Sequence, residues 1–368
     1  MKKEMKPIQL VSEKQKSDDE MLARIVTRGK KERYSDISLL IARSFMEKRI
    51  NEELESIRES GFARLYIMMY LITGRARMEG IGIGLGYGAM ASSTVCYCLQ
   101  ITDVDPWRYN LCSARFVNER VPTFTFEVEK ERVEEFCEIA ESLFKAAHEE
   151  KKPYFHCDLL KVVPMEYPAK LKNVKMPLRG FSGLGIKRIL QKLCNDEAGY
   201  CWWYGKTGRD ALKQFRPRHF QDLLNFEALY RPCFMDLMPI VSERMHGNVP
   251  KESYSLHRLL NPTFGEILFQ EQIMGLLHEV FGVGNQESNQ LRIQIQRRQM
   301  DALAEIRPQL FEDSYRRGFS NEEAMQIWEK LVTVPREVPI KAHCLCRVMT
   351  ACLLAMSDEA EKNEFVLH

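Results

Sequence analysis

Long apolar runs are missing from this chain. No uninterrupted stretch reaches the roughly 20 residues that a membrane-spanning helix needs, so the sequence predicts no membrane contact. The N-terminal segment MKKEMKPIQLVSEKQKSDDE is basic but lacks the apolar core of a signal peptide, and we expect residues 1–17 to form a flexible tail. Eleven cysteines without a secretory signal are typical of reduced thiols, which favours a cytoplasmic protein.

A strong net charge is missing as well. The chain has 53 Lys and Arg residues against 51 Asp and Glu residues, which gives a formal net charge of +2 over 368 residues. This balance excludes a global electrostatic argument for nucleic-acid binding, so any such argument depends on local clusters. With 45% hydrophobic residues, a chain of this length predicts two or three domains with a sizeable core.

Internal repeats and low-complexity tracts are also lacking, and most of the chain has helical periodicity. The segment FARLYIMMYLIT (62–73) is apolar all round, which predicts a buried helix. The segment 264–282 predicts either a strand, a turn and a helix or one long helix. Further helices are expected over 129–150, 187–193, 217–230, 285–332 and 341–357. We therefore expect a mixed α/β protein that is mostly helical.

One segment, VPTFTFEV (121–128), predicts a β-strand because its side chains alternate in character. Its apolar face consists of Phe124, Phe126 and Val128. Its polar face consists of Thr123, Thr125 and Glu127. The apolar face is suited to a core, while the polar face offers two hydroxyls and a single carboxylate for chemistry.

Glycine recurs at every second position from 80 to 88, in GIGIGLGYG. The backbone N–H groups of such a loop could bind phosphate, but no Lys or Arg lies between Arg77 and Arg108 to assist. Tight packing of the loop is the alternative interpretation. The later GYCWWYGKT (199–207) has five residues between its glycines where an ATP-binding loop has four, so no ATP site is predicted there.

A metal site is not predicted either. His343, Cys344 and Cys346 are soft ligands, but no second pair with zinc-site spacing accompanies them. Buried thiols on a helix are the simpler interpretation of this cluster.

Two local charge patterns are more informative. Between Leu171 and Leu193 the chain has six bases and no acid, a pattern that fits either a nucleic-acid backbone or a solvated face. These bases are Lys172, Lys175, Arg179, Lys187, Arg188 and Lys192. The segment 127–150 has nine acids against three bases and should repel phosphate.

Five segments occur in an order that carries a family resemblance. GFARLYIMMYLITGRARMEGI leads into the glycine loop and the ITDVDP turn, and RFVN precedes the strand. RDALKQFRPRHFQDLLNFEALYRP, PTFGEILFQEQIM and KAHC follow. From about residue 18 to about residue 357, the chain resembles the alpha subunit of bacterial DNA polymerase III, a C-family DNA polymerase.

The resemblance implies a nucleotidyltransferase-like palm with a small mixed sheet, a shortened thumb and helical fingers. It places the palm at 18–128 and 170–190, the thumb at 129–169 and the fingers at 191–368. It also implies a truncated chain, without the family's N-terminal PHP domain and without its clamp-binding and OB-fold regions.

The resemblance also implies a damaged catalytic centre. Thr125 and Glu127 occupy the two positions of the family's metal-binding aspartates, and Gly180 occupies that of the third carboxylate. Two Mg²⁺ ions need anionic bridging oxygens, so we expect an inactive chain without a metal or other cofactor. The phosphate- and nucleotide-binding positions implied by the resemblance are Gly84, Gly86, Gly88, Arg292, Lys341 and His343.

Three functional hypotheses follow. The leading one is a catalytically degenerate protein of DNA replication or repair that binds DNA weakly and non-specifically, with replication proteins as further partners. Its expected DNA contacts are Lys172, Lys175, Arg179, Lys187, Arg188 and Arg209. The second is an active Mg²⁺-dependent DNA-directed DNA polymerase in which Asp103, Asp105 or Asp158 assist Glu127. The third is an interaction protein without DNA affinity, which docks a basic partner through the acidic segment.

Overall fold

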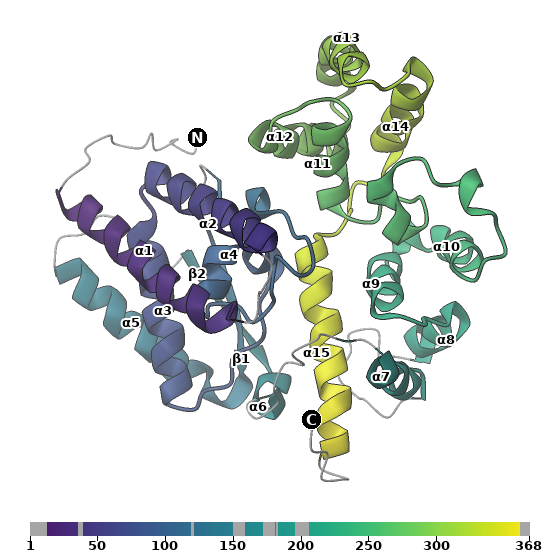
Figure 1. Ribbon diagram of the computed structural model, residues 1–368. Coiled ribbons are helices and arrows are strands. Elements are labelled where there is room, and N and C mark those ends of the chain that lie inside the picture. The colour runs from purple at the N-terminus through teal and green to yellow at the C-terminus, as the bar shows by residue number, and fades with distance from the viewer. Residues whose placement is uncertain are drawn as a thin grey trace. The chain divides into compact units, whose positions relative to one another are not determined.

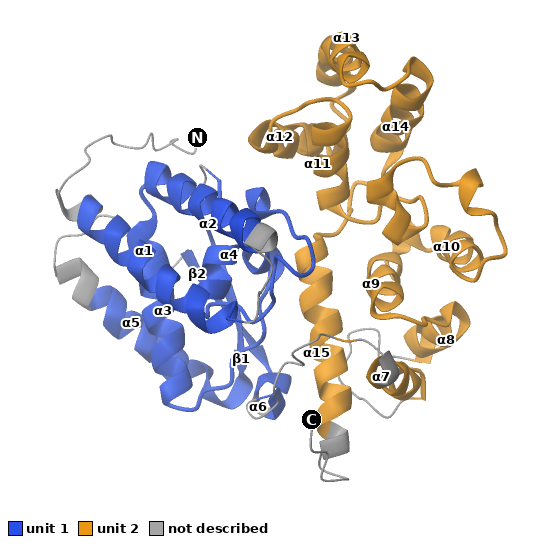
Figure 2. Cartoon of the chain, viewed as in Figure 1, with its two compact units in different colours: residues 1–173 blue, residues 174–368 orange. Residues whose placement is uncertain are grey.

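The computed structural model describes most of the chain. The described residues are 13–35, 40–118, 121–149, 159–171, 181, 183–195 and 206–360. The chain divides into two compact units, residues 1–173 and residues 174–368, which are coloured separately in Figure 2. Within the described ranges, no helix is both long and apolar enough to span a membrane.

The first unit packs helices around a short sheet (Figure 1). Its helices are α1 (Glu13–Arg33), α2 (Leu40–Ser60), α3 (Ala63–Met78), α4 (Thr94–Cys98), α5 (Val133–Glu149) and α6 (Tyr167–Leu171). The apolar segment 62–73 forms most of α3, as the sequence predicts, and Met69 and Ile72 have no exposed surface. Helix α3 packs against both α1 and α5, which explains why so much of it is apolar.

The sheet contains two parallel strands, β1 (Phe124–Glu129) and β2 (Leu160–Met165). Helix α5 connects them, so the three elements form a β-α-β unit. The predicted alternation along β1 is confirmed: Phe124, Phe126 and Val128 are buried, although the strand begins at 124 and not at 121. Phe124 packs edge-on against Tyr66 and Phe116, with ring centroids 5.3 and 5.2 Å apart.

The second unit contains only helices and irregular segments among its described residues (Figure 1). Its helices are α7 (Gly183–Asn195), α8 (Lys206–Phe215), α9 (Phe220–Leu229), α10 (Leu237–Met245), α11 (Gln270–Glu279), α12 (Asn285–Gln296), α13 (Met300–Arg316), α14 (Asn321–Thr333) and α15 (Lys341–Ala360). Helix α15 packs against α7 and α9. The mixed, mostly helical fold expected from the sequence is therefore confirmed.

One correction of detail applies to this unit. The segment 264–282 forms neither a strand nor one long helix, because Phe264 and Gly265 have left-handed backbone conformations with φ of 53° and 86°. The chain turns there and α11 begins at Gln270. The helices predicted over 285–332 are confirmed as three, α12, α13 and α14, which are separated at Arg298 and Gly318 by residues with positive φ. The predicted boundaries of palm, thumb and fingers stay predictions.

Candidate functional site

The polar face of β1 is the candidate catalytic surface. Thr125 and Glu127 are both half-buried on this face, as the sequence predicts. In the parallel register Thr125 pairs with Lys161 of β2 and Glu127 pairs with Val163. Paired residues of neighbouring strands point to the same side of a sheet, so the register partner of Thr125 on this face is a cation. The positive charge of a lysine at this position would repel a metal ion, and the lysine cannot replace a missing carboxylate ligand.

The Glu127 carboxylate is already engaged. The Tyr167 hydroxyl, which α6 supplies, donates a hydrogen bond to Glu127 Oε2. Tyr167 is only 6% exposed, so its ring covers this side of the carboxylate. Gly84 of the glycine loop lies against the same pair, and its backbone N–H donates to the Glu127 carbonyl at 2.8 Å.

Gly84 is required by this packing. A Cβ atom at position 84 would lie 2.5 Å from Tyr167 Oη, closer than real Cβ atoms approach, and at a tight 3.1 Å from Glu127 Oε2. The loop, the tyrosine and the carboxylate are therefore packed too tightly for a further side-chain atom. This contact favours the packing interpretation of Gly84 over the phosphate-binding one.

The rest of the glycine loop continues the edge of the sheet. Ile83 forms an antiparallel bridge with Val128, and the Gly82 N–H donates to the Glu129 carboxylate at 3.0 Å. Gly86 has φ of 150°, and a Cβ there would lie 3.3 Å from Thr102. Gly88 has φ of 60° and open space around the position of its missing side chain. Phosphate binding at Gly84, Gly86 and Gly88 stays a prediction.

The acids proposed as substitute metal ligands have other partners. Asp103 forms ion pairs with Arg33 at 2.6 Å and with Arg77 at 3.3 Å. Asp105 Oδ1 accepts hydrogen bonds from the Tyr34 hydroxyl and the Trp107 N–H, both at 2.9 Å. Burial, and then the Asp105 charge, raises the pKa of Tyr34, so its hydroxyl stays a donor. These contacts stabilise the TDVDP turn.

The donor set on β1 does not fit a pair of Mg²⁺ ions. Such a pair needs several anionic oxygens in octahedral geometry, with at least one carboxylate between the ions. Thr125 is neutral, and the Tyr167 hydroxyl occupies one oxygen of Glu127. Among the described residues, no three His, Cys, Asp or Glu side chains lie together as metal ligands do. Gly180 and Asp158 lie outside the described residues.

The predicted phosphate ligands of the second unit lie on α12 and α15. Arg292 is buried in α12, where it donates to Asn289 Oδ1 at 2.9 and 3.1 Å and to the Gln296 amide oxygen. Lys341 begins α15, and its backbone N–H donates to the Glu271 carboxylate at 2.8 Å. Burial lowers the pKa of the Lys341 ammonium, while Glu271 opposes that shift.

His343 lies two positions after Lys341 on α15. Burial, together with the positive charges of Arg347 and Arg231, lowers the pKa of its imidazole to about 4. The ring is therefore neutral at pH 7. Glu227, which has no exposed side-chain surface, lies 3.6 Å from both arginines. Nucleotide binding by Arg292, Lys341 and His343 stays a prediction.

Sequence reasoning missed the roles of Glu271 and Tyr167. Glu271 joins the FQEQ segment to the KAHC segment, because its carboxylate accepts the N–H groups of Lys341 and Ala342. The order of those two segments in the chain was a usable signal. Tyr167 gave no comparable signal, since forty residues separate it from Glu127 and no motif contains both.

The predicted DNA contacts are only partly described. Lys187 and Arg188 are exposed on α7, and Arg209 is half-exposed on α8. Lys172, Lys175 and Arg179 lie outside the described residues. The structure therefore places two of the six predicted bases on one exposed helix face and a third on the neighbouring helix.

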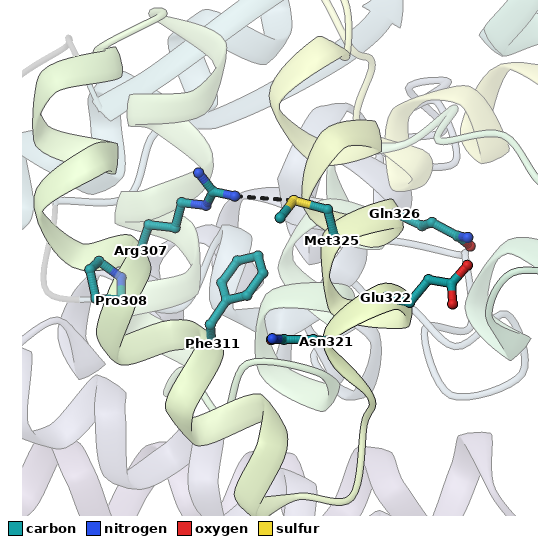
Figure 3. A pocket seen from close by; sticks show the side chains of 7 residues that line it. All are labelled: Arg307, Pro308, Phe311, Asn321, Glu322, Met325 and Gln326. Atoms are coloured by element: carbon teal, nitrogen blue, oxygen red, sulfur yellow. Dashed lines mark hydrogen bonds between the residues drawn. The ribbon is translucent and has the colours of Figure 1, made fainter.

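A shallow pocket of about 580 Å³ lies between α13 and α14, and none of its lining residues was predicted from the sequence (Figure 3). Its Arg307 side chain lies over the Phe311 ring at 5.0 Å and donates to Met325 Sδ at 3.1 Å. The pocket is mainly apolar and its one arginine is already in contact with neighbours, so it offers little to a phosphate group.

Comparisons with known proteins agree with the two-unit organisation. Residues 20–151 match the bacterial DNA polymerase III alpha NTPase domain, and residues 205–318 match the bacterial DNA polymerase III alpha subunit finger domain. Each match lies within one of the two units, and both matched models describe parts of one polymerase subunit. The chain belongs to the family of bacterial DNA polymerase III alpha subunits, which confirms the resemblance inferred from the sequence.

Individual relatives match parts of the chain. The DNA polymerase III subunit alpha of Bacillus subtilis is 26% identical over 188 residues, 50% of this chain and 17% of that protein. The same subunit of Halalkalibacterium halodurans is 31% identical over 151 residues, 40% of this chain and 13% of that protein. That of Aquifex aeolicus is 29% identical over 127 residues, 33% of this chain and 11% of that protein. The chain thus spans less than a fifth of the length of these relatives.

Proposed function

We propose that this protein is a catalytically degenerate member of its family that acts by binding DNA. The observation that carries the proposal is the hydrogen bond from Tyr167 to Glu127 beneath Gly84. At the family's metal-binding positions, this chain has a neutral threonine and a glutamate that a buried phenol already binds. A two-metal phosphoryl transfer has no bridging carboxylate there.

Local charge supports DNA binding by the second unit more than by α5. Glu134, Glu135, Glu138 and Glu141 are all exposed on α5, and like charges repel phosphate. Helix α7 contains no acid, and it exposes Lys187 and Arg188. Contacts of this kind neutralise phosphates and do not recognise the nucleobases. We therefore expect non-specific affinity for DNA, with a Kd of roughly 10⁻⁴ to 10⁻⁶ M at physiological salt.

Two measurements test this function. Primer extension with Mg²⁺ and with Mn²⁺ should show no nucleotide addition, and extension that disappears in Glu127→Ala would overturn the degeneracy. Duplex binding should weaken with salt, and Lys187→Ala with Arg188→Ala should make the slope of log K against log salt shallower by up to about two units. An unchanged slope in this variant would remove α7 from the proposed DNA contacts.

A protein partner is the second candidate, and the exposed acids of α5 favour it. A basic peptide would find a row of carboxylates there, of which Glu135 and Glu141 have nearby cations, Arg132 at 2.5 Å and Lys145 at 3.8 Å. Replication proteins are among the candidate partners of α5. Charge reversal of Glu134 and Glu138 to Lys should abolish binding of a basic peptide without weakening DNA binding, and the opposite result would reject this candidate.

A further inference from the structure

Helix α8 has a basic face, of which the sequence predicted only Arg209 as a DNA contact. Lys206, Arg209 and Lys213 follow one another at intervals of three and four residues, so they lie on one side of the helix. Arg216 comes directly after the helix at a left-handed position with φ of 53°. The opposite side, formed by Gly208, Leu212 and Phe215, is buried. The helix is therefore strongly amphipathic, with a basic outer face.

These bases differ from several cations of the second unit that have partners within the fold. Arg244 pairs with Glu266, Arg298 donates to the carbonyl groups that end α14, and Arg218 donates to the Met245 carbonyl. Lys206, Lys213 and Arg216 are exposed and have no hydrogen-bond or ion-pair partner within the described part of the chain. Their positive charges are therefore available to a ligand.

The neighbouring helix extends this basic surface. Helix α7 packs against α8, and the two appear side by side in Figure 1. Lys187 and Arg188 are exposed on α7, which has no acidic residue. On α8 the single acid is Asp210, which is exposed and lies four residues after Lys206 and three before Lys213. It therefore shares their side of the helix, where Lys206, Arg209 and Lys213 outnumber it. We call the surface formed by Lys206, Arg209 and Lys213 the α8 basic face.

We infer that the α8 basic face holds one nucleic-acid backbone strand through its phosphates, an inference that rests on the proposed function and adds a second contact helix to it. From position 206 to 213 the helix rises about 10 Å, which corresponds to about three phosphates at 3.4 Å per nucleotide of one strand. Lysine acts as a flexible point charge, so contacts of this face position a strand without selecting its sequence.

A membrane surface does not fit this helix. Interfacial helices insert an apolar face between lipids, whereas the apolar side of α8 is already buried in its own unit. Phe215, for example, packs on Phe226 of α9 with ring centroids 5.6 Å apart. The phosphates of a nucleic-acid strand, in contrast, need only the exposed lysine and arginine side chains.

The test measures binding of the full chain to a labelled mixed-sequence oligonucleotide, single-stranded and as a duplex, across a salt series. Lys206→Gln with Lys213→Gln should make the slope shallower by up to about 1.8 units for duplex and about 1.4 units for single strand. The matched control is Lys251→Gln with Arg336→Gln, which removes two exposed charges elsewhere in the same unit and should keep the wild-type slope. Lys206→Arg with Lys213→Arg should also keep it.

The outcomes separate this inference from the proposed function. If only the Lys187 and Arg188 variant loses slope, the α8 basic face is not a contact while DNA binding by the protein stands. If the wild type binds neither oligonucleotide, both ideas are wrong. If the matched control loses as much of the salt slope, the effect depends only on net charge and the inference is overturned. Equally strong, variant-sensitive binding of poly-glutamate would overturn it in favour of an acidic protein partner.

Discussion

The polar face of β1 and the basic face of α8 use charge in opposite ways. On β1 the carboxylates of Glu127 and Glu129 accept hydrogen bonds from Tyr167 and Gly82, so both are bound within the fold. On α8 the ammonium groups of Lys206 and Lys213 have no partner in the described part of the chain. A family catalytic position can therefore become part of the packing while a charged surface elsewhere stays available to a ligand.

The difference follows from what each element covers. Strand β1 has a core on one side, α6 against the other side and the glycine loop along its edge, so its polar groups need internal partners. Helix α8 buries one side only and leaves the other to solvent. The predictions below test this contrast, beginning with the largest expected effect.

Removing the buried side of β1 should be the most damaging single change. Phe124 has no exposed surface, so Phe124→Ala should lower the free energy of unfolding by about 3–5 kcal/mol, which reflects lost burial and a cavity. Urea unfolding followed by circular dichroism measures this loss. The control is Val121→Ala, because Val121 is 51% exposed just before the strand. Similar losses in both variants would contradict the assigned faces of β1.

The packing of Gly84 against Tyr167 can be tested by a double-mutant cycle. Gly84→Ala places a Cβ atom 2.5 Å from Tyr167 Oη and should cost about 1–3 kcal/mol of stability. Tyr167→Phe removes that oxygen but leaves the Glu127 carboxylate without its donor, which should also cost about 1–3 kcal/mol. In the double variant the clash is relieved. Its loss of stability should therefore be smaller than the sum of the two single losses by about 0.5 kcal/mol or more.

Strict additivity in this cycle would mean that the loop and the tyrosine do not touch. The close contact between Gly84 and Tyr167 would then be absent. The packing interpretation of Gly84 would lose its support, and phosphate binding by the glycine loop would gain it.

Stability should also depend on pH through His343. Its folded pKa of about 4 lies below the ordinary 6.5, so the unfolded chain binds a proton first as pH falls. The contribution of the neutral ring is fully present above about pH 6.5 and is lost progressively as pH falls towards 4. His343→Asn should therefore lose less thermal stability between pH 7 and pH 5 than the wild type does. His219→Gln, at an exposed position, is the control and should follow the wild type.

The sequence predicted the elements better than it predicted their partners. Alternation over 121–128 and the apolar segment 62–73 were sufficient for β1 and α3, because each pattern reflects local burial. The break at Phe264 was missed because a left-handed non-glycine residue leaves no reliable trace in composition. Family order identified Thr125 and Glu127 as site positions. The contact with Tyr167 depends on how α6 folds back onto β1, which no local pattern encodes.

The smallest expected effect concerns the stability of α8, and it tests the other half of the comparison. Lys206→Gln with Lys213→Gln should change the free energy of unfolding by no more than about 0.5 kcal/mol, since both side chains are exposed and without partners in the described residues. Arg244→Gln is the matched change at a basic residue of the same unit that has hydrogen-bond partners. Arg244 donates to Glu266 at 2.7 Å and to the Phe264 carbonyl at 2.9 Å, so its loss should cost about 1–3 kcal/mol. Urea unfolding at one pH and salt concentration compares the two variants. Equal destabilisation would show that the lysines of α8 stabilise the fold, and the physical reason for expecting a ligand on that face would be lost.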